Sequence, residues 1–453
     1  MKRRIVTATL AVLFAASGPS GAQVIDKARY ADKVKQEFLF AWNNYKKYAW
    51  GHDELSPLTE SYHDWYGQSL LLTPVESYDT MLLMSLKKEA EEDKTLILDS
   101  LSFDKDIPVS NFEITIRMLG GLLSAYELDG NKGFLKLATD LANRLMPVFD
   151  SPTGMPYRFV NLKTGKTSGD ISNPAEIGSL IIEWGTLSRL TGNPIYFQKA
   201  KKALVALFDR RSKKTGLVGA TINVNTGEWV DGEGSIGGGI DSYYEYLIKG
   251  AILFHDKQLR HMWDVSVKAV DKYLAQDIDG ELWYGWANME TGVVNKPYFG
   301  SLDAFFPAEL ALGGELKRAE ELQNSCYKMW LYYGIEPEEI DYKTMKIVSS
   351  GYYLRPENIE SNYYMYEFTH NPEYLCRAAT YLNTLIYNCR VKHGFVSLSD
   401  VRTKQKINDM PSYFLAETLK YLYLTFAPDS VLNFNDVIFN TEAHPMQRDF
   451  KAK

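Results

Sequence analysis

A repeating pattern of two helices and a short hairpin constrains the fold of this 453-residue chain more than any other feature. Four segments open with glycine and then alternate apolar residues, as β-strands do. They are 154–161, 216–223, 280–288 and 394–400, and the first three lead to Thr-Gly pairs typical of turns. With Gly334 included, the opening glycines are 54 to 64 residues apart. A period of this length indicates one supersecondary unit repeated along the chain.

Between these segments, apolar residues recur with the period of a helix. The pattern predicts helices over 111–128, 174–190, 194–208, 241–254, 307–333 (two helices interrupted at Gly313 and Gly314), 357–369, 372–388 and 412–426. The period leaves room for two earlier units, so we expect about seven in all. Closed on itself, such a repeat is a mainly α fold, an (α/α)7 barrel with short β-hairpins between repeats. An open solenoid is the alternative, but it needs polar capping repeats that the chain does not show.

The first residues read as a separate segment. Three basic residues at 2–4, an apolar run at 5–16 and small residues at 20–22 form the pattern of a signal peptide. The apolar run is shorter than the ~20 residues that span a bilayer, and no later segment suits a membrane helix. We therefore predict a signal peptide at 1–22, a single barrel domain at 23–453, and export to the periplasm or secretion. The sequence holds no Asn-x-Ser/Thr acceptor, which favours a bacterial protein.

Charge and cysteine content exclude several classes of function. Without residues 1–22 the chain carries 47 basic and 57 acidic residues, a net charge of −10. This balance argues against a nucleic-acid partner, since no basic excess is left to neutralise phosphates. Three cysteines exclude a disulfide scaffold and a cysteine-rich zinc site. We expect Cys326, Cys376 and Cys389 to be free, buried thiols, the last two on one helix.

Acidic residues recur at one position of the repeat. Counting 21 to 25 residues from each opening glycine gives Glu176, Asp241, Ser301, Glu357 and Glu417. Equivalent positions of a closed ring face one mouth, so four of the five would place a carboxylate there. Helix capping is the alternative explanation, and it accounts well for Asp241. It accounts less well for Glu417, which lies inside an apolar stretch, and inward carboxylates are costly unless paired or functional.

Several segments, read in chain order, carry a resemblance to a known family. They are AWGHDELSP (49–57), NFEITIRMLGGLLSAY (111–126), LSRLTG (187–192), DSYYEYLIK (241–249), LRPENIES (354–361), AETLKYLY (416–423) and FNTEAHP (439–445). From about Phe38 to Pro445 the chain resembles glycoside hydrolase family 47, the class I α-mannosidases, and we interpret it as a bacterial member. The resemblance implies an (αα)7 barrel that hydrolyses terminal α-1,2-linked mannose with inversion, using bound Ca²⁺.

The resemblance also implies catalytic roles. Inverting hydrolysis needs one carboxyl to protonate the leaving oxygen and another to activate water, about 6.5–9.5 Å apart. Glu113 corresponds to the general acid, and Asp241 is the second candidate; the sequence does not settle which of them donates the proton. Glu357 corresponds to the general base. It follows Pro356 in a first helical turn, where backbone N–H groups and the helix dipole should keep it ionised.

Residues for substrate and metal follow from the same resemblance. Those expected to bind substrate are Arg117, Glu176, Arg355, Glu360, Tyr413, Glu417 and Glu442. Arg117 lies one helical turn after Glu113 and can orient it, and Tyr413 would form a platform under the sugar. The family binds Ca²⁺ through the hydroxyl and carbonyl oxygens of one threonine, which is Thr441 here. Calcium accepts six to eight oxygens in loose geometry, so waters ordered by Glu176, Glu360, Glu417 and Glu442 can complete the site.

Four departures from the family pattern leave the specificity open. Gly239 replaces an arginine of members restricted to one glycan branch, Ser301 replaces a histidine, Ala304 a cysteine and Pro411 an acidic residue. Gly239 and Ser301 leave open a second hypothesis, a lectin-like mannose-glycan-binding member with little hydrolysis, although the intact catalytic carboxylates argue against it. A third, another (α/α) toroid glycosidase or lyase, is disfavoured because those families lack the NTEAHP ending. We expect a monomer whose partner is a mannose-containing oligosaccharide, without nucleic acid or a membrane span.

Overall fold

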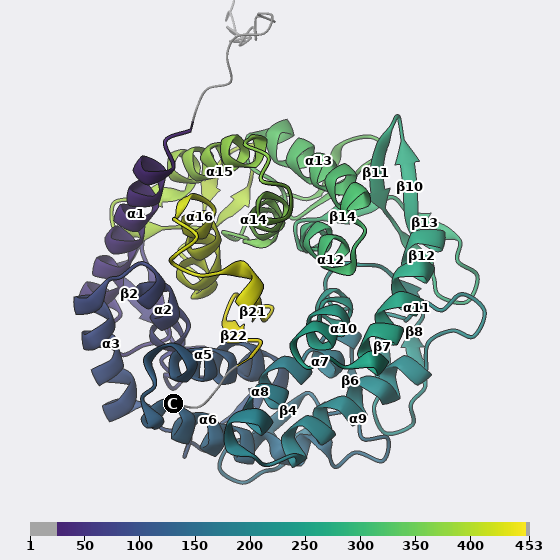
Figure 1. Ribbon diagram of the computed structural model, residues 1–453, viewed down its shortest axis with the longest axis horizontal. Coiled ribbons are helices and arrows are strands. Elements are labelled where there is room, and N and C mark those ends of the chain that lie inside the picture. The colour runs from purple at the N-terminus through teal and green to yellow at the C-terminus, as the bar shows by residue number, and fades with distance from the viewer. Residues whose placement is uncertain (1–24, 450–453) are drawn as a thin grey trace, which may run out of the picture.

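Two concentric rings of helices surround a central axis (Figure 1). The computed structural model describes residues 25–449, so the predicted signal peptide at 1–22 lies outside the described residues. Within the described part, the helices form seven inner–outer pairs, of which six are hairpins along the chain and the seventh joins α1 to α16. The predicted (α/α)7 barrel is therefore confirmed.

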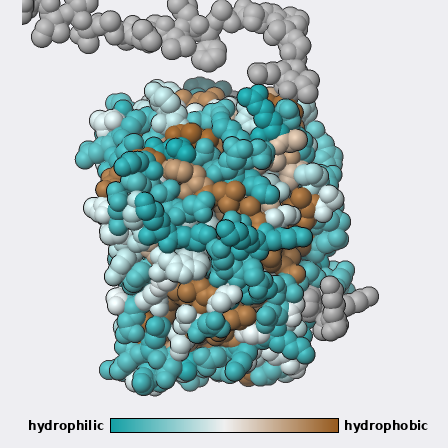
Figure 2. Space-filling model, turned by 90° about the vertical axis from the view of Figure 1, so that its left-hand side faces the viewer, coloured by the Kyte–Doolittle hydropathy of each residue, from teal (hydrophilic) through white to brown (hydrophobic). Residues whose placement is uncertain are grey.

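The outer helices are amphipathic, with one stripe of apolar residues turned toward the inner ring. In α6, for example, the buried residues are Phe134, Ala138, Leu141, Ala142 and Leu145, which recur at helical spacing. The outer ring consists of α1 (Lys27–Tyr48), α3 (Lys87–Ser100), α6 (Lys132–Leu145), α9 (Ile195–Asp209), α11 (Lys257–Tyr273), α13 (Leu316–Tyr333) and α15 (Glu373–Cys389). Figure 2 shows the barrel wall on the left-hand side of Figure 1, where hydrophilic residues predominate.

The inner helices are buried on nearly all sides, because the outer ring covers one face and the neighbouring inner helices the others. In α10 every residue from Ser242 to Ala251 is buried. The inner ring consists of α2 (Leu72–Leu83), α4 (Asn111–Ile114) with the π-helical turn η1 (Thr115–Leu119) and α5 (Gly120–Asp129), α7 (Pro174–Gly178) with α8 (Ile181–Thr191), α10 (Asp241–Leu253), η3 (Leu302–Phe305) with α12 (Phe306–Gly313), α14 (Glu357–Thr369), and the π-helical turn η4 (Phe414–Thr418) with α16 (Leu419–Phe426).

The ring closes between the two ends of the chain. Helix α1 packs on the outside of α16, so the first described helix covers the last one (Figure 1). Tyr30 of α1 stacks on Phe426 of α16, with 5.0 Å between the ring centroids. Trp42 of α1 is fully buried and stacks on Tyr45 of the same helix. Closure of this kind rules out the open solenoid.

Small antiparallel sheets hold the N-terminal ends of the inner helices at one end of the barrel. In four of them, the strand before an inner helix pairs with the hairpin of the next repeat: β3 (Pro108–Ser110) with β4 (Phe159–Asn161) and β5 (Thr167–Ser168); β6 (Ile171–Ser172) with β7 (Thr221–Asn223) and β8 (Trp229–Asp231); β9 (Glu233–Gly234) with β12 (Trp286–Asn288) and β13 (Val294–Lys296); β14 (Tyr298–Gly300) with β15 (Glu339–Asp341) and β16 (Lys346–Ser349). These strands are shorter than the alternating segments of the sequence, and the repeat's opening glycines all have positive φ.

The remaining strands form two-stranded hairpins: β1 (Glu54–Ser56) with β2 (Ser61–His63), β10 (Ala275–Ile278) with β11 (Glu281–Tyr284), β17 (Arg390–Val391) with β18 (Gly394–Phe395), β19 (Leu398–Asp400) with β20 (Gln405–Lys406), and β21 (Val437–Phe439) with β22 (Pro445–Gln447). The 3₁₀ turns η2 (Met146–Phe149) and η5 (Phe434–Asp436) complete the elements. The hairpin β21–β22 lies within the ring and contacts α5 and α10, and its Phe439 packs against Tyr421 of α16 (Figure 1).

The cysteines partly match the expectation. All three are unpaired, and Cys326 and Cys389 are buried. Cys376 is exposed, which corrects the prediction of a buried thiol, because it lies on the outward face of α15. Among residues 25–449, no helix combines the length and hydropathy that crossing a membrane requires.

Candidate active site

A cavity of about 970 Å³, including the space open at its mouth, lies where the inner helices begin. Its lining comes from the N-terminal parts of the inner helices and from the turn between β21 and β22. The structure brings all eleven sequence-predicted site residues to this lining: Glu113, Arg117, Glu176, Asp241, Arg355, Glu357, Glu360, Tyr413, Glu417, Thr441 and Glu442. Of the five repeat-register positions, Ser301 does not line the cavity and is fully buried; Leu302 lines it instead.

Arg117 joins three carboxylates at one side of the cavity. Its guanidinium lies 2.9 Å from Glu113, 3.1 Å from Glu76 and 2.5 Å from Glu442. Burial alone would lower the pKa of Arg117, but Glu442 and the other carboxylates raise it well above its ordinary value. The pair with Glu113 is therefore part of a buried network rather than a solvated i,i+4 salt bridge.

Local structure fixes the direction of Glu113 and Arg117. The Ser110 hydroxyl accepts a hydrogen bond from the Glu113 N–H and caps the start of α4. Arg117 lies in the π-helical turn η1, and such turns are frequent at functional sites because they re-aim a side chain. Glu417 lies in η4, and among residues 25–449 these are the two π-helical turns.

Glu357 begins α14 beside Arg355, which is itself held by a two-point ion pair with Glu338 at 3.1–3.3 Å. Burial raises the pKa of Glu357 to about 8, although Arg355 opposes the rise. This corrects the expectation that the helix start keeps Glu357 ionised. Inside the ring Glu357 has lost its contact with bulk water. This loss raises its pKa by more than the backbone N–H group and the Arg355 cation lower it.

Asp241 is the first residue of α10 and accepts a hydrogen bond from the N–H of Ser242 at 2.8 Å. Burial raises the pKa of Asp241 to about 7, and the Glu245 carboxylate adds to the rise. The N-cap residue, Ile240, makes no side-chain cap, and Asp241 is an acidic residue in the first turn of α10. The preference for acidic residues in a first helical turn therefore still accounts for Asp241, and its place in the cavity lining is a separate observation.

Glu176 and Tyr413 make contacts that limit what each can offer a ligand. Glu176 is engaged by Arg158 through two hydrogen bonds of 2.6 and 2.7 Å. Tyr413 donates its hydroxyl to the carbonyl of Tyr353 at 2.6 Å, so its ring rather than its hydroxyl is presented to the cavity. A half-buried ring fixed in this way suits stacking against the apolar face of a sugar.

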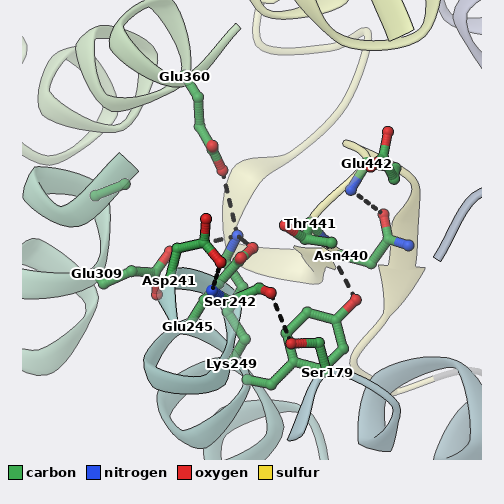
Figure 3. Close-up of polar contacts among 12 residues, drawn as sticks. Ser179, Asp241, Ser242, Glu245, Lys249, Glu309, Glu360, Asn440, Thr441 and Glu442 are labelled. Atoms are coloured by element: carbon green, nitrogen blue, oxygen red, sulfur yellow. Dashed lines mark hydrogen bonds and ion pairs between the residues drawn. The ribbon is translucent and has the colours of Figure 1, made fainter. Parts of the chain in front are cut away.

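Thr441 lies in a turn that several hydrogen bonds define. Asn440 accepts hydrogen bonds from the N–H groups of Glu442 and His444 and donates to Glu183 at 2.7 Å. The Thr441 N–H donates to the Tyr246 hydroxyl at 3.4 Å, and Ala443 has a φ of 58°. Such over-determined strained turns occur at functional sites. Figure 3 shows this turn between Glu442 and the side chains of α10.

The donor atoms near Thr441 fit Ca²⁺. Among the described residues, the Thr441 hydroxyl and carbonyl oxygens have no protein hydrogen-bond partner. Glu360, Glu417 and Glu442 line the same cavity, so the available ligands are all oxygen atoms, as a hard cation prefers. Burial and the adjacent Glu442 raise the pKa of Glu417 well above its ordinary value, and a bound cation would offset this concentration of carboxylates.

Three functional-site candidates were missed from the sequence. Glu76 pairs with Arg117, Glu245 lines the cavity, and Lys249 lies beneath it. A signal existed for two of them, since Asp241, Glu245 and Lys249 recur every four residues in an otherwise apolar helix. Glu76 gave no such signal, because its partner is 41 residues away.

The (α/α)7 ring, its carboxylate-lined cavity and the match to a family profile together identify the chain as a glycoside hydrolase. Residues 37–448 match the profile of glycosyl hydrolase family 47, and the chain belongs to that family.

Individual relatives agree with this assignment. The chain is 38% identical over 477 residues to ER degradation-enhancing alpha-mannosidase-like protein 2 of Mus musculus, covering 98% of this chain and 82% of that protein. It is 36% identical over 459 residues to mannosyl-oligosaccharide 1,2-alpha-mannosidase IA of Sus scrofa, covering 94% and 69%. The structure is similar to the alpha-1,2-mannosidase from Trichoderma reesei, with a TM-score of 0.87 and 29% identity over 93% of this chain and 99% of that one.

Proposed function

We propose that the protein is a Ca²⁺-dependent, inverting exo-α-1,2-mannosidase that releases terminal mannose from mannosides or high-mannose glycans. The observation that carries the proposal is the gathering of Glu113, Asp241 and Glu357 with Thr441 around one cavity. The family membership and the alpha-1,2-mannosidase relatives support the choice of linkage.

In this proposal the carboxyls divide the proton transfers. Glu113 and Asp241 are available to protonate the leaving oxygen, and Glu357 removes a proton from the attacking water. Arg355 stabilises the ionised form of Glu357 that this step requires. Arg117 holds Glu113 in place, and Tyr413 stacks beneath the sugar ring.

Thr441 would hold Ca²⁺ through its hydroxyl and carbonyl oxygens, and Glu360, Glu417 and Glu442 would orient the surrounding waters. The ion supplies fixed positive charge that orders water and sugar hydroxyls. We also propose that residues 1–22 direct export from a bacterial cell, which mass spectrometry of the mature N-terminus would test.

The test is release of mannose from α-1,2-mannobiose by the full-length protein, followed by NMR. We expect β-mannose as the first product, loss of activity on chelation, and recovery with Ca²⁺. α-Mannose as the first product, or full activity in excess chelator, contradicts the proposal.

A lectin-like role is the second candidate, because a degradation-enhancing mannosidase-like protein is among the relatives. The Glu357→Gln variant separates the two. An enzyme loses about 10²–10⁴-fold in turnover while it still binds α-1,2-mannobiose in calorimetry. Wild-type protein that binds the disaccharide but does not cleave it would favour the lectin.

A further inference from the structure

Beneath the cavity, one buried lysine lies among three glutamates from three different inner helices. The Lys249 ammonium of α10 is 2.6 Å from Glu245, 3.2 Å from Glu360 of α14 and 3.4 Å from Glu309 of α12 (Figure 3). Lys249 and Glu309 are fully buried, and the ring of Tyr364 lies 5.4 Å from the ammonium.

The three glutamates would form a cation cage without the lysine. One carboxylate oxygen from each lies within 4.8 Å of the others, a spacing that could hold a metal ion. The ammonium occupies their shared centre instead, so this cluster already contains its cation. Lysine has one charge and three donors, which suits one ammonium bonded to several carboxylates.

Two of these glutamates also line the cavity, whereas Glu309 does not. Glu245 has the ammonium as its hydrogen-bond donor, and Glu360 has the ammonium and the Tyr421 hydroxyl at 3.1 Å. Without the ammonium, two like charges would lie close together in a site that excludes water. One of them would then take up a proton or turn away.

We infer that Lys249 is a positioning residue, an internal cation that fixes the Glu245 and Glu360 carboxylates toward the sugar-binding cavity. It acts through these two side chains and does not itself line the cavity. The inference rests on the proposed function, since it assigns Glu245 and Glu360 to the same sugar-binding site. A residue behind the binding groups that holds their side chains in place determines how well those groups are pre-organised for the ligand.

The test uses Lys249→Met in the full-length protein, with Arg189→Met as the matched control. Arg189 also pairs with a fully buried glutamate, Glu127, but neither lines the cavity. We expect K249M to raise KM for α-1,2-mannobiose at least tenfold and to weaken its binding equally in an E357Q background. We expect R189M to lower only the melting temperature. Unchanged binding and KM in folded K249M overturn the inference.

Two further measurements keep the inference testable. If K249M does not fold, K249M/E309Q removes a buried carboxyl together with the cation and replaces it as the test variant. A crystal structure of either variant decides the matter even if the wild type shows no hydrolysis. Displaced Glu245 and Glu360 carboxylates support the inference, and unmoved ones overturn it. Absent hydrolysis in the wild type counts against the proposed function alone.

Discussion

At the residue scale, the cavity brings together carboxyl groups whose ionisation destabilises the folded state. The pKa of Glu357 is about 8 in the folded protein against 4.5 in an unfolded chain. A carboxyl whose pKa is raised by folding contributes stability that is fully present below the unfolded pKa and is lost as the pH rises through the folded pKa. The sensitive window for Glu357 therefore runs from about pH 4.5 to 8.

Glu357→Gln should remove this pH dependence. In chelator, we expect the melting temperature of the variant relative to wild type to rise by about 2–4 °C between pH 5 and pH 8. Calorimetry at both pH values measures it. Glu91→Gln is the control, because the Glu91 side chain is exposed. A difference that stays constant with pH would show that Glu357 does not titrate in this window.

Tyr413 offers a separate prediction, because its ring and hydroxyl have different partners. Tyr413→Phe should keep KM within about threefold and cost about 1 kcal/mol of stability, the typical net value of one hydrogen bond. Tyr413→Ala should raise KM about tenfold, because it removes the buried ring area together with an aromatic contact of about 0.5–1.5 kcal/mol. Equal KM values for the two variants would contradict a platform role.

The sequence predicted the members of the cavity lining better than their electrostatic state. Carboxylates at four of the five positions that lie 21 to 25 residues after the repeat glycines could be predicted to share one mouth, since equivalent positions of a ring face the same way. The raised pKa of Glu357 could not be predicted from the sequence, because it depends on burial by helices that are distant along the chain. The same holds for Lys249. Its spacing from Asp241 and Glu245 can be read from the sequence, but its ion pairs with Glu309 and Glu360 form only when distant helices pack together.

At the scale of elements, two inner helices of the described residues contain a π-helical turn that carries a cavity-lining side chain. Helical periodicity predicted continuous helices over 111–128 and 412–426, and the structure has η1 and η4 within them. A π-turn adds one residue to a helix, which changes the direction of nearby side chains and leaves the hydrophobic pattern on either side intact. Periodicity alone could therefore not reveal it.

Deleting Ala416 should convert η4 to regular helix. We expect α16 to keep its packing, so the variant folds, while Glu417 turns from its position and mannoside cleavage falls at least tenfold. Circular dichroism and activity assays check the two parts. Ala416→Gly keeps the residue count, costs about 1 kcal/mol of stability and should stay active. An active deletion variant would show that the π-turn is dispensable.

At the scale of the whole molecule, α1 completes the ring, and its loss should affect every sector. Trp42→Ala removes a fully buried ring of α1 from the core. We expect a loss of about 3–5 kcal/mol in the free energy of unfolding. Denaturant titration followed by both circular dichroism and tryptophan fluorescence should give one coincident transition. Separate transitions would mean that the sector around α1 unfolds by itself. As a control, Trp42→Phe should lose less free energy of unfolding than Trp42→Ala.

The pairing of α1 with α16 also has a consequence for synthesis of the chain. About 370 residues separate the two helices, and the ribosome makes them in that order. At a translation rate of about 5–20 residues per second, roughly 20–75 s pass between synthesis of α1 and synthesis of α16, and the apolar stripe of α1 lacks its partner helix during this time. During that interval the nascent chain presents Phe38 and Trp42 to its surroundings, so chaperones that bind apolar segments should engage its first helix until translation of α16 is complete.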